Sequence, residues 1–301
     1  MQEKTNHGSM KEMTIDQMLS SFGEKLVDEN LNIYLQKQSI SHFPIYHPFR
    51  LDHFTILIID KGEFKIKLNL IEYTLKKDDL IIVLPHSLGQ FISLSNDLLF
   101  KSVSFSAKTL MTLGMEPHQI DSFNFLSSQY PGNVGISKKE SSGLRMLMQL
   151  LARKNKLNPD YPFKEEIILN CFRLFLYEVS AIFKNNSRLV NHYTRREMLF
   201  HEFTKLLLQY LPENRTLKFY ADHLSVTTNY LTKLTKISTG KTAGALIDEM
   251  VILHSKLLLH QMSLSVAEVS QQLFFSDQFI FSRFFKKNAG LSPSAYRKQR
   301  M

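Results

Sequence analysis

The stretch that decides the fold of this chain occurs twice, as LKFYADHLSVTTNYLTKLTKISTG at residues 217–240 and as VAEVSQQLFFSDQFIFSRFFKKNAG at residues 266–290. In the first half of each copy, apolar or small residues follow at spacings of four, three and two: Leu217, Ala221, Leu224 and Val226 against Val266, Ser270, Leu273 and Phe275. In the second half the shared spacings are two, three and four: Leu231, Lys233, Lys236 and Gly240 against Phe281, Arg283, Lys286 and Gly290. The second copy has one extra residue between the halves, which belongs in the turn or at the start of the following helix.

Each copy predicts two short helices joined by a tight turn. Apolar residues four and three apart place one buried face on a short first helix. Hydroxyl or carboxylate side chains, at Thr227 or Thr228 and at Ser276 or Asp277, can cap a second helix, and the two glycines can end it. That second helix has an apolar face and an opposite polar, basic face. This pattern is typical of a helix-turn-helix unit.

A third helix is predicted between the copies. Leu246, Met250, Leu253 and Leu257 are spaced four, three and four apart, which indicates one helix over 243–261. Its length would be about 28 Å, and successive major grooves on one face of DNA lie roughly 34 Å apart. A rigid connector of this length could place both second helices in adjacent grooves.

Charge is concentrated in the last third of the chain. The 301 residues hold 37 Lys and Arg against 28 Asp and Glu, a net charge of +9, and 44% are hydrophobic. From Asn191 onward there are 15 basic and 8 acidic residues, net +7. A basic region beside a nearly neutral one suggests contact with a polyanion, although a solvated basic surface would give the same balance. The composition excludes a disordered chain, a collagen and a coiled-coil rod.

Other features concern the cellular setting. One cysteine, Cys171, cannot form an internal disulfide, which fits a reducing compartment. No apolar run approaches the length of a membrane helix, and the polar start shows no signal peptide. We therefore expect a cytoplasmic, nucleoid-associated protein with no membrane partner.

The first part of the chain has β-strand patterns, followed by helical ones. Residues 54–59 form a run of β-branched and apolar residues, and residues 64–70 alternate between apolar and polar. Short runs continue to Phe105, which predicts a small β-barrel or sandwich. Helical spacing then covers 141–154 and Phe163–Asn185. The charge step and the Asn-rich segment near 185–191 suggest two domains, 1–190 and 191–301. The expected fold class is α+β, with an all-α C-terminal domain.

Residues 275–297, FSDQFIFSRFFKKNAGLSPSAYR, resemble the C-terminal signature of AraC/XylS-type transcription regulators. Residues 219–227, 229–231 and 239–242 resemble the first helix-turn-helix of that family, so the resemblance covers about Tyr193–Met301. It implies a seven-helix domain that binds double-stranded promoter DNA with both units, more often activating transcription through RNA polymerase than repressing it. The N-terminal half resembles the cupin-like effector domains of this family more loosely, at residues 61–63, 73–75, 78–80 and 83–85. This resemblance implies possible control by a small-molecule effector and a homodimer formed through Phe163–Asn185.

The resemblance also assigns DNA contacts, residue by residue. Those to bases fall on Asn229, Thr232 and Lys233 and on Gln278, Phe279, Ile280 and Arg283. Lys236, Lys286 and Lys287 complete the set, with the last two on phosphates. Three features depart from the family: Ser270 replaces alanine, Phe274 replaces glycine, and Phe279 and Ile280 stand where polar or small residues are common. The last pair could touch thymine methyl groups or simply pack.

Barrel residues that alternate toward the interior are candidates for an effector pocket, although core packing is their default role: Phe54, Ile56, Phe64, Ile66, Phe91 and Phe105. We expect no metal, because His42, His47 and His53 are five and six residues apart and no His-x-His occurs. We also expect no cofactor and no enzymatic activity, since nucleophile-elbow, Walker and dinucleotide motifs are missing. The alternatives are a cupin-type metal enzyme with a DNA-binding appendage and a non-specific architectural DNA binder.

Overall fold

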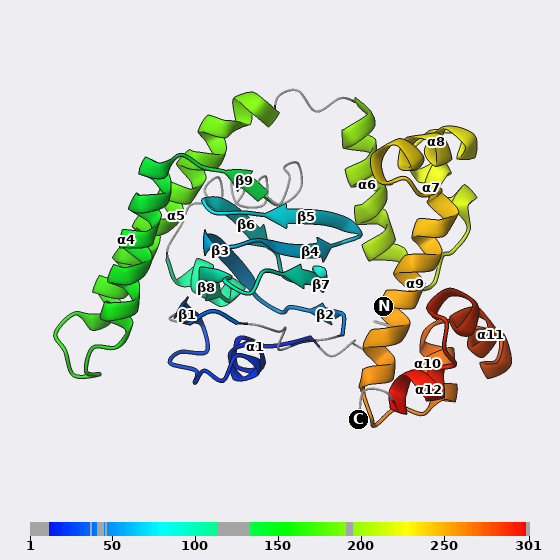
Figure 1. The fold of residues 1–301 in the computed structure, drawn as a ribbon, viewed down its shortest axis with the longest axis horizontal. Coiled ribbons are helices and arrows are strands. Elements are labelled where there is room, and N and C mark those ends of the chain that lie inside the picture. The colour runs from blue at the N-terminus through cyan, green and yellow to red at the C-terminus, as the bar shows by residue number, and fades with distance from the viewer. Residues whose placement is uncertain are drawn as a thin grey trace, which may run out of the picture.

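A computed structural model describes residues 12–36, 38–40, 45, 47–113, 133–190 and 195–298 of the chain. Two packed β-sheets lie in the centre of the molecule, with two long helices on one side and a group of helices on the other (Figure 1). The long helices are α4 (Lys138–Asn155) and α5 (Lys164–Val190). The predicted α+β organisation is confirmed, and in the part of the chain described no helix is long and apolar enough to cross a membrane.

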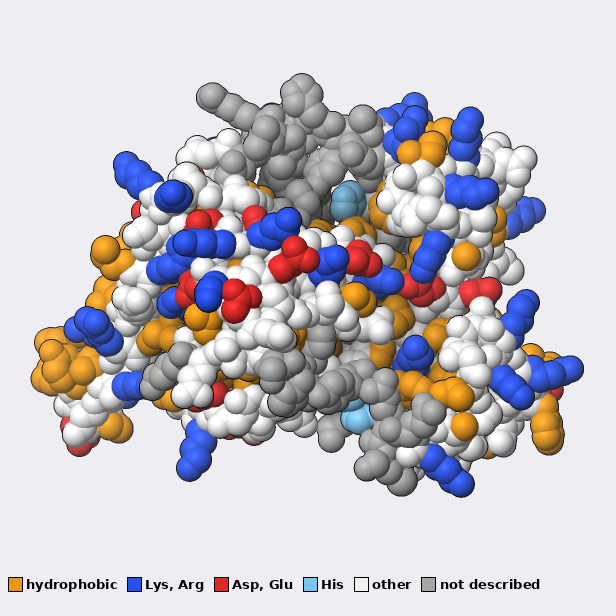
Figure 2. Space-filling view, in the orientation of Figure 1, with side chains coloured by type: hydrophobic (Ala, Val, Ile, Leu, Met, Phe, Trp, Pro, Cys, Tyr) orange, Lys and Arg blue, Asp and Glu red, His pale blue; other side chains and the backbone are white. Residues whose placement is uncertain are grey.

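The surface differs between these parts. In the view of Figure 2, acidic and basic side chains are mixed over the β-sheets, whereas lysine and arginine side chains predominate over the outer side of the C-terminal helices. The helices on that side are α6 (Arg195–Tyr210), α7 (Leu217–His223), α8 (Thr228–Thr239), α9 (Ala243–His260), α10 (Val266–Gln272), α11 (Gln278–Ala289) and α12 (Pro293–Lys298). The excess of basic residues in the last third of the sequence is therefore also found on one side of the folded protein.

The strands form two antiparallel sheets rather than one closed barrel. The five-stranded sheet has, in order, β1 (Leu31–Leu35), β8 (Leu99–Phe105), β3 (Phe54–Lys61), β6 (Asp79–Val83) and β9 (Asn133–Gly135). The four-stranded sheet has β2 (Phe49–Arg50), β7 (Leu88–Leu94), β4 (Phe64–Leu68) and β5 (Ile71–Leu75). No described strand pair joins the sheets, so the predicted barrel is corrected to an open sandwich.

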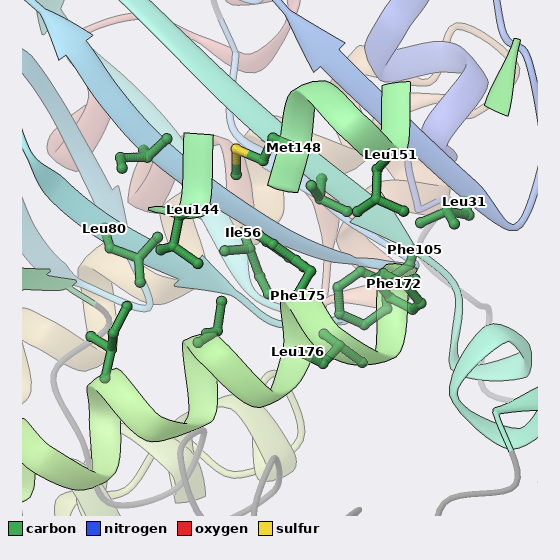
Figure 3. Close-up of a cluster of buried hydrophobic side chains, with 14 of the residues drawn as sticks. Leu31, Ile56, Leu80, Phe105, Leu144, Met148, Leu151, Phe172, Phe175 and Leu176 are labelled. Carbon is green, nitrogen blue, oxygen red and sulfur yellow. The ribbon is translucent and has the colours of Figure 1, made fainter. Parts of the chain in front are cut away.

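Apolar side chains fill both faces of the five-stranded sheet. Toward the second sheet they form one core with the short helix α1 (Ile15–Ser21). On the other face, β3 and β8 pack against α4 and α5, for example through Ile56, Phe105, Leu144 and Phe172 (Figure 3). A strand covered on both faces reads as a continuous apolar run, which explains the sequence of β3.

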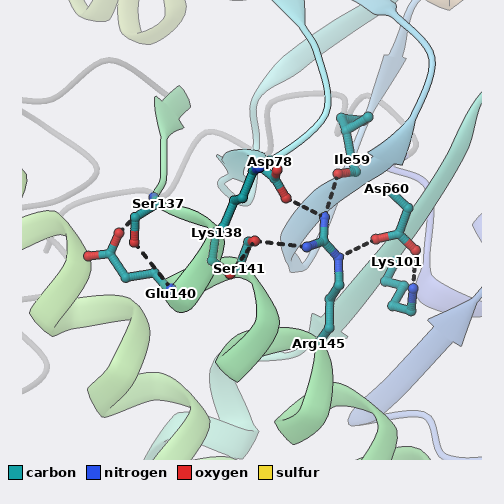
Figure 4. A network of polar contacts seen from close by, with 9 residues as sticks. All are labelled: Ile59, Asp60, Asp78, Lys101, Ser137, Lys138, Glu140, Ser141 and Arg145. Atoms are coloured by element: carbon teal, nitrogen blue, oxygen red, sulfur yellow. Dashed lines mark hydrogen bonds and ion pairs between the residues drawn. The ribbon is translucent and has the colours of Figure 1, made fainter.

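A polar network fixes α4 to the edge of the sandwich. The helix starts with a capping box at Ser137, and Arg145 lies two turns further on. Arg145 Nε donates to Asp60 Oδ1 at 2.6 Å, and its guanidinium also reaches Asp78 Oδ1 at 2.8 Å (Figure 4). Lys101 completes an ion pair with Asp60. These partly buried contacts set the position of α4 on β3, while α2 (Ala107–Thr112) follows β8 directly.

The sandwich contacts the C-terminal helices directly. Leu70 and Leu88 belong to one buried apolar cluster with residues of α6, α7, α8 and α9. Beside them, Lys67 Nζ lies 2.9 Å from Glu249 Oε1. The other carboxylate oxygen of Glu249 lies 2.6 Å from Lys241 Nζ, just after α8. Glu249 therefore links the sandwich, the connecting helix α9 and the first helix-turn-helix unit.

Candidate nucleic-acid interface

The two copies of the repeat have the same backbone plan. The helices α7 and α10 have 7 residues each, and α8 and α11 have 12 each. Among the proposed capping residues, Thr227 and Asp277 accept hydrogen bonds from the N–H groups of Tyr230 and Ile280, at 3.1 and 2.7 Å. Because α7 and α10 are offset by 49 positions and α8 and α11 by 50, the extra residue of the second copy is Ser276.

Two glycines end the longer helices. Gly240 has φ 75° and Gly290 has φ 81°, so both occupy the left-handed region that glycine adopts without strain. In each case the glycine N–H donates to the carbonyl oxygen four residues back. Equal starts and equal ends make residue n of α8 equivalent to residue n + 50 of α11.

Each unit has its own apolar core, and both cores include α9. Leu231 and Leu234 pack in the first core, whereas Phe281 and Phe285 pack in the second. Twelve of the eighteen residues of α9 are buried, among them Met250 in the first core. The predicted helix over 243–261 is thus present as one continuous connector held from both sides.

The residues predicted to contact DNA are on the outer faces of α8 and α11. All but one are exposed to solvent, and Thr232 is half-buried: Asn229, Lys233, Lys236, Gln278, Phe279, Ile280, Arg283, Lys286 and Lys287. The structure therefore brings the predicted residues together in two sets, one on each helix. Basic side chains over both helices are visible in Figure 2.

Two residues of α8 were missed although the repeat identifies them. Thr228 is equivalent to Gln278, and Tyr230 is equivalent to Ile280. Tyr230 is 43% exposed. Carrying Gln278 and Ile280 back to the first copy would have added both positions, so the set on α8 is Thr228, Asn229, Tyr230, Thr232, Lys233 and Lys236. The position equivalent to Lys287 is the exposed but apolar Ile237.

The serine at position 270 has a buried hydroxyl group without a hydrogen-bond partner among the described residues. The equivalent residue of the first unit is Ala221, which packs in the same place on α7. A buried, unsatisfied polar group costs about 1–3 kcal/mol. The family's alanine would remove that cost.

We therefore expect Ser270→Ala to stabilise the protein by about 1 kcal/mol, measured by urea unfolding. Ser255→Ala is the matched control, because the Ser255 hydroxyl is also buried in a helix but donates to the carbonyl oxygen of Val251 at 2.7 Å. The control should not gain stability. A loss of stability in Ser270→Ala would show that this hydroxyl has a partner.

Phe274 adopts the conformation that its glycine counterpart in the family would favour. Its φ is 53°, and the equivalent Ser225 has φ 52°, so this position of the turn has the same left-handed conformation in both units. The Phe274 side chain is 59% exposed and contributes little packing. The second turn therefore keeps the left-handed conformation at this position, at the cost of a strained phenylalanine.

Replacing Phe274 with glycine is expected to raise the free energy of unfolding by about 0.5–1 kcal/mol, because relief of the left-handed strain exceeds the extra flexibility of the unfolded chain. Thermal unfolding would measure this effect. Phe279→Gly is the control: it also removes an exposed phenylalanine, but from inside a helix, and should destabilise. An unchanged or lower stability for Phe274→Gly would contradict the strain argument.

The sandwich encloses an apolar cavity of about 80 Å³ between its sheets and α1. Three residues of the predicted pocket line it, namely Phe64, Ile66 and Phe91. The other three, Phe54, Ile56 and Phe105, were wrongly placed: they are on the opposite face of the five-stranded sheet, against α4 and α5. The inward residues of those strands are Thr55 and Leu57 on β3 and Phe100, Ser102 and Ser104 on β8.

A second cavity, of about 400 Å³, lies between the sandwich and the end of α9. Its lining combines polar residues, among them Gln17, Arg50 and His260, with apolar ones such as Met13 and Leu257. The ring centroids of His47 and His260 are 3.6 Å apart across this contact. Nearby, His254 is completely buried, and burial together with the Arg50 charge lowers its pKa to about 3.

The described residues contain no group of three or more His, Cys, Asp and Glu side chains that could hold a metal ion. His47 lies at the contact with α9, and His53 pairs with Asp52 at 2.7 Å. His42 lies outside the residues described. The expected absence of a metal site stays a prediction for the whole chain.

The helix predicted to mediate dimerisation, Phe163–Asn185, corresponds to α5. One face of α5 is buried against the sandwich, with Phe172, Phe175 and Val179 fully covered. Another face carries Leu174 and Tyr177, which are 48% and 44% exposed. The helix is thus core on one face and surface on the other.

Residues 220–299 match the helix-turn-helix domain family. The Msm operon regulatory protein of Streptococcus mutans serotype c is 37% identical over 79 residues, which are 26% of this chain and 28% of that protein. The HTH-type transcriptional activator RhaR of Salmonella dublin is 27% identical over 104 residues, 35% of this chain and 37% of RhaR. These matches confirm the resemblance to AraC/XylS-type regulators and define the C-terminal region as a helix-turn-helix domain of that type.

The matches leave most of each relative uncovered, since this chain spans between a quarter and two fifths of their lengths. Among solved structures, fatty-acid-bound ToxT from Vibrio cholerae has 18% identity and a TM-score of 0.41, covering 90% of this chain and 96% of ToxT. The AraC-like transcriptional activator CuxR has 12% identity and a TM-score of 0.31, covering 74% and 73%.

Proposed function

We propose that this protein is a sequence-specific transcription regulator that binds promoter DNA through both helix-turn-helix units. The observation that carries the proposal is the equivalence of α8 and α11, which have equal lengths, equivalent caps and exposed polar and basic residues at the same helical positions. The relatives of this region are an operon regulatory protein and a transcriptional activator, which supports the same function.

The connecting helix supports binding to two consecutive grooves. With 18 residues, α9 is about 27 Å long, and both units pack on it. Successive major grooves on one side of DNA are roughly 34 Å apart. The proposal places α8 in one major groove and α11 in the next, as part of the same rigid body.

The contacts divide by chemistry. Asn229 and Lys233 on α8, and Gln278 and Arg283 on α11, carry groups that pair with base edges in the major groove. Lys236, Lys286 and Lys287 are one turn further along and would neutralise phosphates. Thr232 is half-buried and reaches the groove only with its outer side.

Selection of tightly bound fragments from genomic DNA by the purified full-length protein tests this proposal. Enrichment of a site that spans about two helical turns per protomer is expected at near-physiological salt. Retention of all fragments alike would instead indicate a non-specific architectural binder.

We place the domain boundary between 1–190 and 191–301. The fragment 191–301 should select the same site, since both cores of the helix-turn-helix units are built from it, except for the contacts of Leu70 and Leu88. A site selected by this fragment but not by the full chain would mean that the sandwich holds the protein in an inactive state until an effector binds.

The cavity in the sandwich supports control by a small apolar effector. Its lining is apolar apart from a few hydroxyl groups, and the Thr55 and Ser104 hydroxyls already pair at 3.0 Å. Drug-sized ligands need about 300 Å³ or more, so a larger effector would have to displace α1. Mass spectrometry of solvent extracts from the purified protein would detect an apolar ligand, and Ile66→Trp, which fills the cavity, should abolish its retention.

We further propose that the protein is a cytoplasmic homodimer that activates transcription by contacting RNA polymerase. The exposed Leu174 and Tyr177 on α5 support the dimer. Sedimentation of the wild-type protein should show a dimer, and Leu174→Glu with Tyr177→Glu should give a monomer of unchanged fold. A reporter fused to the selected promoter would show activation, and repression would reverse the proposed sign.

A further inference from the structure

Three equivalent positions on the recognition faces of α8 and α11 differ in chemistry only at the first of them. On α8, Asn229, Lys233 and Lys236 are spaced i, i+4 and i+7, which places them on one face. The equivalent residues of α11 are Phe279, Arg283 and Lys286. The second and third positions carry a positive charge in both units. The first position changes from a hydrogen-bonding amide to a phenyl ring.

Phe279 is not part of the folded core. It is 77% exposed, more than any other large hydrophobic residue described. The aromatic core of the second unit is formed by other residues of the same segment, including Phe281, Phe285 and Tyr296. Ile280, the neighbour of Phe279, is also exposed, at 39%. Folding therefore does not explain why a phenylalanine stands at this position.

The surroundings of Phe279 are cationic and polar. Arg283 and Lys286 follow it on the same face, Lys287 lies beside them, and Gln278 precedes it, all exposed. An apolar tip among cations fits a partner that offers apolar groups inside a negatively charged groove. In the major groove of DNA that apolar group is the 5-methyl of thymine, which phenylalanine contacts.

We propose that Phe279, assisted by Ile280, reads thymine methyl groups, so that the second unit selects a thymine-containing segment. The first unit, with Asn229 in the equivalent place, selects adenine there, because an asparagine side chain pairs with the N6 and N7 edge of adenine. The two halves of each site then differ in sequence, and the protein binds them in one direction only. This inference rests on the proposed function.

The test compares thymine with uracil, which lacks only the methyl group. In the site selected by the wild-type protein, each thymine under the second unit is replaced singly by uracil, and affinity is measured by fluorescence anisotropy at fixed salt. Loss of one buried methyl group should weaken binding about fourfold at the contacted thymines. Uracil at thymines under the first unit should have no such effect.

Variants of Phe279 assign the effect to this side chain. At the thymine contacted by Phe279, Phe279→Ala should bind the thymine and uracil sites equally, whereas Phe279→Leu should retain part of the preference. Phe279→Asn copies the first unit and should shift the preferred base at that position from thymine to adenine. Because Phe279 is exposed, all three variants should keep the wild-type melting temperature within a few degrees.

Three results would overturn the inference: a selected site without thymine under the second unit, wild-type binding that is indifferent to uracil, or an equal loss in wild type and Phe279→Ala. Each of these leaves the DNA-binding function intact, because the wild-type protein still selects a site. Failure of the protein to select any site, by contrast, would overturn the proposed function itself.

Discussion

Arg283→Ala is expected to weaken binding to the selected site by about 1–3 kcal/mol, which is roughly a 5- to 150-fold loss of affinity. Arg283 is exposed on the recognition face of α11 and its guanidinium can pair with both the O6 and N7 atoms of guanine. Lys233→Ala, the equivalent change on α8, should have an effect in the same range. Random DNA should lose much less affinity, because it offers no matching base.

Fluorescence anisotropy with the selected site and with a scrambled site, at one salt concentration, would measure both losses. Lys205→Ala is the control for charge, since Lys205 is exposed on α6, outside the two recognition helices. It should change neither affinity substantially. An equal loss on selected and scrambled DNA would show that Arg283 and Lys233 contact phosphates rather than bases.

Acid is expected to destabilise the protein through His254. In the folded protein, burial and the neighbouring Arg50 charge lower the pKa of His254 to about 3, whereas an unfolded histidine has a pKa near 6.5. Below pH 6.5 the unfolded chain therefore takes up a proton that the folded chain does not. The contribution of His254 to the free energy of unfolding is fully present above pH 6.5. It falls as the pH approaches 3, by about 2 kcal/mol between pH 6.5 and 5.

Urea unfolding at pH 7 and pH 5, with His254→Leu for comparison, would isolate this contribution. The variant should lose about 2 kcal/mol less than the wild type between the two pH values. Both ring nitrogens of His254 lack a hydrogen-bond partner among the described residues, so leucine also removes an unsatisfied polar group. Parallel losses in the two proteins would place the acid sensitivity in other groups.

The helix-turn-helix repeat could be predicted because its determinants are local. Periodic apolar residues, a capping side chain and a terminal glycine lie within one short segment in each unit, Thr227–Gly240 and Asp277–Gly290. Long-range packing was not needed for any of these inferences. The left-handed conformation at Phe274 could not be predicted in the same way, because a phenylalanine disfavours positive φ and its presence suggests a turn that bends differently.

The sandwich shows where sequence reasoning fails. Alternation identifies which side chains share a face only when one face is polar, and the run Phe54–Ile59 is apolar apart from Thr55. Which of its side chains face the cavity depends on α4 and α5, which begin more than seventy residues further along the chain. The same holds for closure of the barrel, which depends on pairing between distant strands. The contact between His47 and His260 likewise has no local signal.

The buried connector α9 has a consequence for the DNA. A helix that is covered along most of its length cannot bend or rotate one unit relative to the other, so it fixes the rotational phase between the two bound segments. One inserted base pair turns the second segment by about 35° around the DNA axis, and five turn it to the opposite side. For a protein that reads two grooves in this way, α9 determines the spacing of the two bound segments, just as α8 and α11 determine which bases are bound.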